Sequence, residues 1–173
     1  MPGSGAMDSD LRNTCAHLID YASRKQRHVT RSTFAAELFA ATDAFDQLWN
    51  VAVAWHEVKC GPQTATVIRQ LREQGGLDPQ TAICVDALSV HAAVVAQHVK
   101  APAESNLLGH VQFLCELLDT HVLTYFCWLD TRDMVSDGLT KGAIDRTCLH
   151  KLMSGSLRRE HDVKTWTTSR RPP

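Results

Sequence analysis

Three acidic residues stand beside apolar stretches of this sequence, and each could bring a carboxylate to the inside of a fold. Glu37 lies in "STFAAELFA", Asp86 follows the apolar run "TAICV", and Asp137 lies in "DMVSDGLTKG". A buried carboxylate is unfavourable unless it is paired or bound to metal, and Mg²⁺ prefers oxygen ligands. Three carboxylates at one end of a sheet therefore favour a divalent cation. Taken singly, each acid is better explained as a helix-end or surface carboxylate.

The elements that must position these acids alternate between strands and helices, which is typical of a mixed or parallel sheet flanked by helices. Asp86 ends a predicted strand, and the carboxyl ends of such strands are where α/β proteins bind ligands. We predict strands over residues 17–22, 81–87 and 122–130, and helices over 33–58, 64–74, 88–99, 105–120 and through "RTCLHKLM" to 153.

The first long helix is the clearest element in the pattern. Ser32 or Thr33 can cap it, and Gly61-Pro62 ends it. Apolar residues recur at alternating spacings of four and three, which predicts one buried stripe made of Phe34, Leu38, Ala41, Phe45, Leu48, Ala52 and Trp55.

Composition places the chain among ordinary globular proteins. It has 173 residues, is 44% hydrophobic and carries a formal net charge of −1, so no global field draws it to nucleic acid or to an acidic membrane. We expect a flexible leader at 1–13, one domain at 14–155 and a basic tail at 156–173. No stretch approaches the ~20 apolar residues of a membrane span, so we expect no membrane partner.

Six cysteines are scattered along the chain and none forms a C-x-x-C pair, which argues against a zinc knuckle. Cys84 and Cys127 fall in strand-like apolar runs, and we predict that both are buried thiols. Free thiols favour a reducing compartment, so the expected location is intracellular, in the nucleus or the cytoplasm.

Basic residues gather in two places. Arg24, Lys25, Arg27 and Arg31 form a turn that could grip a phosphate backbone or could simply be solvated. Ser32 could reach a phosphate or cap the helix. The tail carries Trp166 among basic residues, which fits either a nucleic-acid arm or a disordered terminus.

The order of four motifs resembles the ribonuclease H domain of copia-type retrotransposon Pol polyproteins, most closely copies from dinoflagellate genomes. The match runs from about His17 to Met153. "LIDYASRKQ" is similar to the family's third strand and basic turn. "STFAAELFA" is similar to its S-S-T-E-A-E-Y stretch, "CVDALS" to D-N-Q-S, and "DMVSDGLTKG" to D-Q-L-A-D-x-x-T-K.

This resemblance implies a ribonuclease H-like mixed sheet and cleavage of the RNA strand of RNA–DNA hybrids by two metal ions. It places the catalytic and metal-binding carboxylates at Glu37, Asp86 and Asp137, with Mg²⁺ or Mn²⁺ as cofactor. The implied partners are an RNA–DNA hybrid or structured RNA, and the reverse transcriptase part of the same polyprotein.

The chain also departs from the family pattern. The family has a further aspartate on its first strand, but only 16 residues precede His17, so we expect the first strands and one metal ligand to be missing. Metal would then be held weakly and cleavage impaired. The alternatives are a catalytically dead nucleic-acid-binding module and a polyprotein fragment that needs a partner chain.

Overall fold

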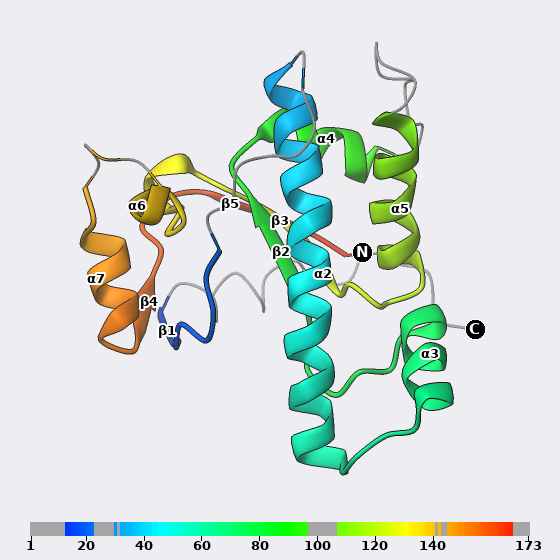
Figure 1. The fold of residues 1–173 in the computed structure, drawn as a ribbon. Coiled ribbons are helices and arrows are strands. Elements are labelled where there is room, and N and C mark those ends of the chain that lie inside the picture. The colour runs from blue at the N-terminus through cyan, green and yellow to red at the C-terminus, as the bar shows by residue number, and fades with distance from the viewer. Residues whose placement is uncertain are drawn as a thin grey trace, which may run out of the picture.

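The computed structural model describes residues 13–22, 30, 32–96, 107–140, 142 and 145–167. Its centre is a three-stranded mixed sheet with the order β2-β3-β5, formed by Ala82–Val85, Tyr125–Leu129 and Val163–Trp166. β2 runs parallel to β3, and β5 pairs antiparallel with the other edge of β3. The expected mixed α/β architecture, a sheet flanked by helices, is therefore confirmed (Figure 1).

The long helix α2, Thr33–Cys60, crosses the sheet and supplies most of one wall of the core (Figure 1). The Ser32 side chain accepts a hydrogen bond from the Ala35 amide at 3.2 Å, as expected of an N-cap. Gly61 ends the helix at φ 85°, a conformation that favours glycine. The predicted start, end and cap of this helix are confirmed.

Three further helices complete this part of the molecule: α3 (Ala65–Gln74), α4 (Leu88–Val95) and α5 (Leu107–Asp119). Helices α2, α4 and α5 share one apolar core with β2 and β3. Its most deeply buried side chains include Leu38, Phe45, Val90, Leu114, Leu118, Leu123 and Phe126. Burial on this scale is the main force that holds such a fold together.

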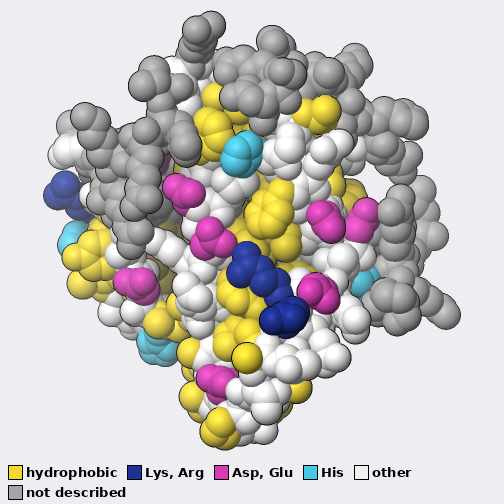
Figure 2. Space-filling model, turned by 45° about the vertical axis from the view of Figure 1, so that its right-hand side comes forward, with side chains coloured by type: hydrophobic (Ala, Val, Ile, Leu, Met, Phe, Trp, Pro, Cys, Tyr) yellow, Lys and Arg dark blue, Asp and Glu magenta, His cyan; other side chains and the backbone are white. Residues whose placement is uncertain are grey.

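Arg72 of α3 packs against side chains of α2. Its guanidinium lies 5.9 Å from the ring centre of Phe45 and 5.6 Å from that of Trp49, and it forms an ion pair with Asp46 at 3.5 Å. Figure 2 shows apolar side chains running down this side of the molecule, with acidic and basic side chains interspersed around them. The basic side chain therefore covers aromatic surface through a cation–π contact.

A smaller unit lies to one side of the sheet (Figure 1). It contains β1 (Asn13–Cys15), paired antiparallel with β4 (Ser156–Arg158), and the short helices η1 (Thr131–Asp133), α6 (Asp137–Thr140) and α7 (Thr147–Met153). The chain enters this unit from β3 and returns to the sheet through β5.

Two predictions about the ends of the fold are wrong. Residues 17–22 form no strand, and Leu18, Ile19 and Tyr21 are exposed, because an alternating pattern becomes a strand only where a neighbour can pair with it. The segment after Gly155 is not a structureless tail, because β4 and β5 follow and Trp166 packs against the core. Of the leader expected at 1–13, residues 1–12 lie outside the described residues and Asn13 begins β1.

Two predictions about burial are also wrong. Trp55 is 50% exposed, and the buried side of α2 instead continues through Trp49, Ala52 and His56. A stripe with a mean spacing near 3.5 drifts around a helix of 3.6 residues per turn, so over 28 residues the buried face moves away from it. Cys84 is exposed on β2, a strand at the edge of the sheet, whereas Cys127 on the central strand β3 is buried as expected.

Candidate functional site

The three predicted carboxylates occupy different environments. Glu37 is exposed in the second turn of α2, Asp86 is half-buried directly after β2, and Asp137 is buried at the start of α6. The indole of Trp128 fixes the backbone at Asp86, because its Nε1 donates to the Asp86 carbonyl oxygen at 2.8 Å. Asp86 therefore lies at the carboxyl end of its strand, where the sequence places it.

Within the described residues, no group of three or more His, Cys, Asp or Glu side chains is arranged to hold a metal ion. Carboxylates are the right donors for Mg²⁺. As placed, however, Glu37, Asp86 and Asp137 do not form a three-ligand cation site. Among the described residues there is therefore no preformed centre of the kind that the resemblance implies.

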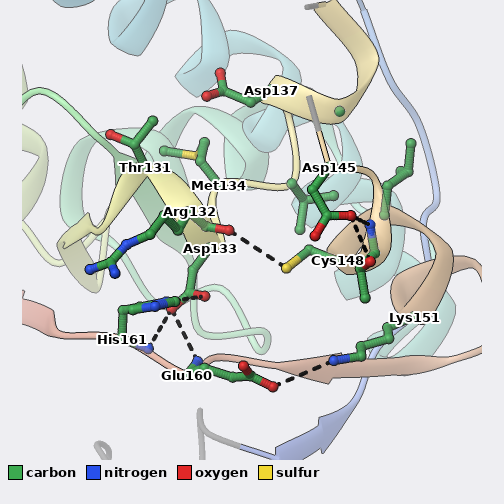
Figure 3. Close-up of a pocket in the computed structure, with 14 residues that line it drawn as sticks. Thr131, Arg132, Asp133, Met134, Asp137, Asp145, Cys148, Lys151, Glu160 and His161 are labelled. Carbon is green, nitrogen blue, oxygen red and sulfur yellow. Dashed lines mark hydrogen bonds and ion pairs between the residues drawn. The ribbon is translucent and has the colours of Figure 1, made fainter. Parts of the chain in front are cut away.

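A different acid of the segment "DMVSDGLTKG", Asp133, makes several hydrogen bonds. It is 3% exposed. One of its oxygens accepts from the amides of Glu160 and His161 at 3.1 and 2.8 Å, and the other lies 2.9 Å from His161 Nδ1 (Figure 3). Asp133 thus ties the segment after β3 to the loop that leads into β5.

The geometry relates the orientation of His161 to the carboxylate. A carboxylate in its ionised form can only accept hydrogen bonds, so the tautomer of His161 that pairs with it is the one with a proton on Nδ1. The second ring nitrogen, Nε2, is thereby directed away from the carboxylate. A carboxylate–histidine pair of this kind orients an imidazole as a base or ligand, and it equally serves as a structural link.

The pair borders a pocket of about 360 Å³ between η1, α6, α7 and the loop before β5. Its lining includes Asp137, Asp145, Cys148, Lys151 and Glu160 (Figure 3). In that view the Asp137 carboxylate points away from the Asp133–His161 pair. Asp133 and Asp137 therefore line the same pocket, but their carboxylates do not point toward each other.

Most polar groups of this pocket hold the local structure. Asp145 accepts from the Thr147 amide and hydroxyl at 2.9 and 2.6 Å, which lowers the pKa of its carboxyl and supports the start of α7. Lys151 pairs with Glu160 at 3.5 Å. These contacts stabilise the wall of the pocket and leave fewer groups to act on a bound molecule.

Cys148 is a poor nucleophile in this setting. Its sulfur lies 3.7 Å from the Arg132 carbonyl oxygen. Desolvation, followed by the nearby charge of Asp133, raises the pKa of the thiol. Because the thiolate is the reactive form, cysteine chemistry beside His161 is disfavoured.

The predicted phosphate contacts are described only in part. Arg24, Lys25, Arg27 and Arg31 lie outside the described residues. Ser32 is described, and its hydroxyl is engaged in capping α2.

Sequence reasoning missed Asp133 and His161 as a pair. The signal that could have indicated Asp133 is weak: it directly precedes the apolar residues Met134 and Val135. Two of its three partners are backbone amides, which no residue pattern marks.

No family model, curated protein or solved structure matches this chain. In the part of the chain that the structure describes, no helix combines the length and apolar character needed to cross a bilayer.

Proposed function

We propose that this chain is a ribonuclease H-like domain of retrotransposon origin that engages RNA–DNA hybrids, with cleavage of the RNA strand impaired or lost. The motif order in the sequence is the basis of the proposal. The observation that best supports it is the parallel pair β2–β3 with Asp86 at the carboxyl end of β2. The helix that carries Glu37 packs against this sheet through the shared core.

The impaired form of the proposal rests on the carboxylates. A two-metal nuclease gathers its acidic ligands around two ions that lie about 3.5–4 Å apart, whereas the described acids form no group of three. The loss of a single electrostatic group at a catalytic centre commonly lowers the rate by about 10²–10³. The second candidate, a binding module without cleavage, is favoured by the same observation.

Hybrid recognition would depend on duplex shape and 2′-hydroxyl groups rather than on base sequence. The net charge of −1 supplies no general attraction for phosphates. The proposed contacts are therefore the basic turn of Arg24, Lys25, Arg27 and Arg31, and binding should weaken steeply as salt rises. The reverse transcriptase part of the same polyprotein is the proposed protein partner.

The test is cleavage of a labelled RNA–DNA hybrid in Mg²⁺ and in Mn²⁺, together with binding of the same hybrid over a range of salt. The variants are Asp86→Asn and Glu37→Gln. The matched control is Asp43→Asn, which removes an exposed carboxylate from the same helix as Glu37.

We expect salt-sensitive binding and slow or absent cleavage, with any residual cleavage lost in Asp86→Asn and Glu37→Gln and kept in Asp43→Asn. Binding without cleavage would select the binding module. Rapid cleavage abolished by either variant would overturn the impaired form, and a lack of binding at low salt would overturn the proposal as a whole.

A further inference from the structure

Two cysteines face each other across the parallel strands of the sheet. Cys84 of β2 is in register with Cys127 of β3. Residues in register on neighbouring strands project from the same face of a sheet, so the two thiols lie side by side. On the next strand, Thr165 is in register with Cys127, and its hydroxyl oxygen lies 3.8 Å from the Cys127 sulfur.

The two thiols differ in access to solvent. Cys84 is exposed, whereas Cys127 is 1% exposed. A small reagent can therefore reach Cys84 first. Cys127 is shielded from the reagent and is the only described cysteine in register with Cys84. A two-step thiol exchange requires such a pair, because an accessible thiol first forms a mixed disulfide and a neighbouring thiol then displaces the reagent.

The backbone permits a bond between them. Neighbouring strands lie about 4.8 Å apart, which is inside the range of about 4.4–6.8 Å between the Cα atoms of disulfide-bonded cysteines. The Cβ atoms of such a parallel pair are about as far apart as the strands, which exceeds the ~3.8 Å of a relaxed disulfide. The bond can form, but it carries strain and is readily reduced.

We propose that Cys84 and Cys127 form a reversible thiol-modification site for small-molecule disulfides such as glutathione disulfide. The Cys84 thiolate attacks one sulfur of the reagent, giving a mixed disulfide and releasing one thiolate. The Cys127 thiolate then attacks the Cys84 sulfur and releases the second. Two protein thiols lose two electrons and two protons, and the reagent is reduced to two thiols.

The reaction depends on pH in a defined direction. Although Cys84 is exposed as a residue, its thiol forms a hydrogen bond with Cys127 and is partly desolvated by the surrounding chain, and both effects raise its pKa. The thiolate is therefore scarce at neutral pH, and its fraction grows about tenfold for each pH unit below the pKa. Exchange at Cys84 should be slow at pH 7 and markedly faster at pH 9.

The test uses the full chain, first reduced and then incubated with glutathione disulfide at pH 9 under native conditions. Remaining thiols are alkylated in denaturant, and the chain is digested with trypsin and a glutamate-specific protease. Cleavage after Glu116 separates Cys115 from Cys127, so that mass spectrometry can assign the linked residues. We expect a peptide pair joined through Cys84 and Cys127, which mild reduction releases.

Three variants test the order of the steps. In Cys127→Ala, Cys84 should stop as the mixed disulfide with one glutathione attached. In Cys84→Ser, Cys127 should remain unmodified. Cys60→Ser removes another exposed cysteine and should leave the Cys84–Cys127 link intact.

The proposal is overturned if Cys84 remains a free thiol while Cys60 of the same sample carries glutathione, because the reagent was then active. It is also overturned if the link forms only after unfolding, or if Cys127→Ala leaves Cys84 unmodified. Circular dichroism of the Cys127→Ala chain, compared with that of the unsubstituted chain, establishes that its fold is retained before the assay.

Discussion

Asp133 contacts Glu160 and His161, which lie 27 and 28 residues further along the chain. It therefore joins the segment after β3 to the loop before β5. Asp133→Ala leaves two amides and an imidazole without their acceptor. A buried donor left without its acceptor costs about 1–3 kcal/mol, and three donors lose theirs here, so we expect the free energy of unfolding to fall by about 3 kcal/mol. Urea unfolding measures it.

The control for Asp133 is Asp43→Ala, which removes an exposed carboxylate from α2. An exposed substitution of this kind should change stability by no more than about 0.5 kcal/mol. Equal losses in the two variants would contradict the role of Asp133 as a link between the two segments.

His91 is a buried histidine whose Nε2 has no hydrogen-bond partner, and its ring stacks on Phe126 at 5.9 Å. Desolvation, followed by the charge of Lys164, lowers the pKa of His91. Because the pKa of His91 in the folded chain lies below the unfolded value of 6.5, the contribution of neutral His91 to the free energy of unfolding is fully present above pH 6.5. It is lost as pH falls through the folded pKa, since the unfolded chain binds the proton first.

We therefore expect His91→Phe to flatten the fall in melting temperature between pH 7.5 and pH 5, with little change at pH 7.5. The comparison is His56→Phe. His56 Nδ1 accepts from the Asp78 amide at 3.0 Å, so its loss should cost about 1–2 kcal/mol at pH 7.5, where His91→Phe has little effect. A melting temperature of His91→Phe that falls as steeply as that of the unsubstituted chain would refute this account.

At the scale of elements, the helices and the two apolar strands β2 and β3 are predictable, and the strands β1, β4 and β5 near the chain ends are not. The start and end of α2 follow from Ser32 and Gly61, local signals that act within one turn. Strand β5 spans only Val163–Trp166, and it is held by pairing with β3, more than 30 residues away. No pattern of four residues carries that information, so the segment resembled a charged tail.

The candidate site residues show the same difference between local and tertiary information. The sequence places Asp86 at the end of a strand, because strand propensity and an apolar run are local signals. Whether Glu37, Asp86 and Asp137 meet depends instead on how α2 and α6 sit against the sheet. Such placement is a tertiary property, and the spacing of residues does not determine it.

The junction of α3 with the loop before β3 gives an element-scale prediction. Gly75 has φ 75°, and a Cβ there would lie 2.5 Å from the Thr120 carbonyl oxygen. Gly61 has φ 85° but open space around it. Gly61→Ala should cost about 1–3 kcal/mol from backbone strain alone. Gly75→Ala should cost more, because the α3 terminus must also move from the loop.

Thermal unfolding of both glycine variants separates these two effects. Equal losses would mean that backbone conformation accounts for both positions and that the close approach at Gly75 has no energetic consequence.

At the scale of the whole molecule, the chain leaves the central sheet after β3, forms the smaller unit and returns as β5 (Figure 1). A chain ending at Gly155, the domain boundary expected from the sequence, lacks β4 and β5. It would lose the partner of β1, the outer strand beside β3, and both residues that bind Asp133.

We expect the chain ending at Gly155 to lose cooperative thermal unfolding, whereas a chain ending at Thr167 keeps it. The reason is that the edge of β3 and the carboxylate of Asp133 would both be left without their partners, and unsatisfied buried polar groups cost about 1–3 kcal/mol each. The free energy of unfolding of a typical domain is only about 5–15 kcal/mol, so several such losses together can unfold it. Circular dichroism melts of the two chains measure the difference, and a sharp transition in the shorter chain would place β4 and β5 outside the cooperative fold.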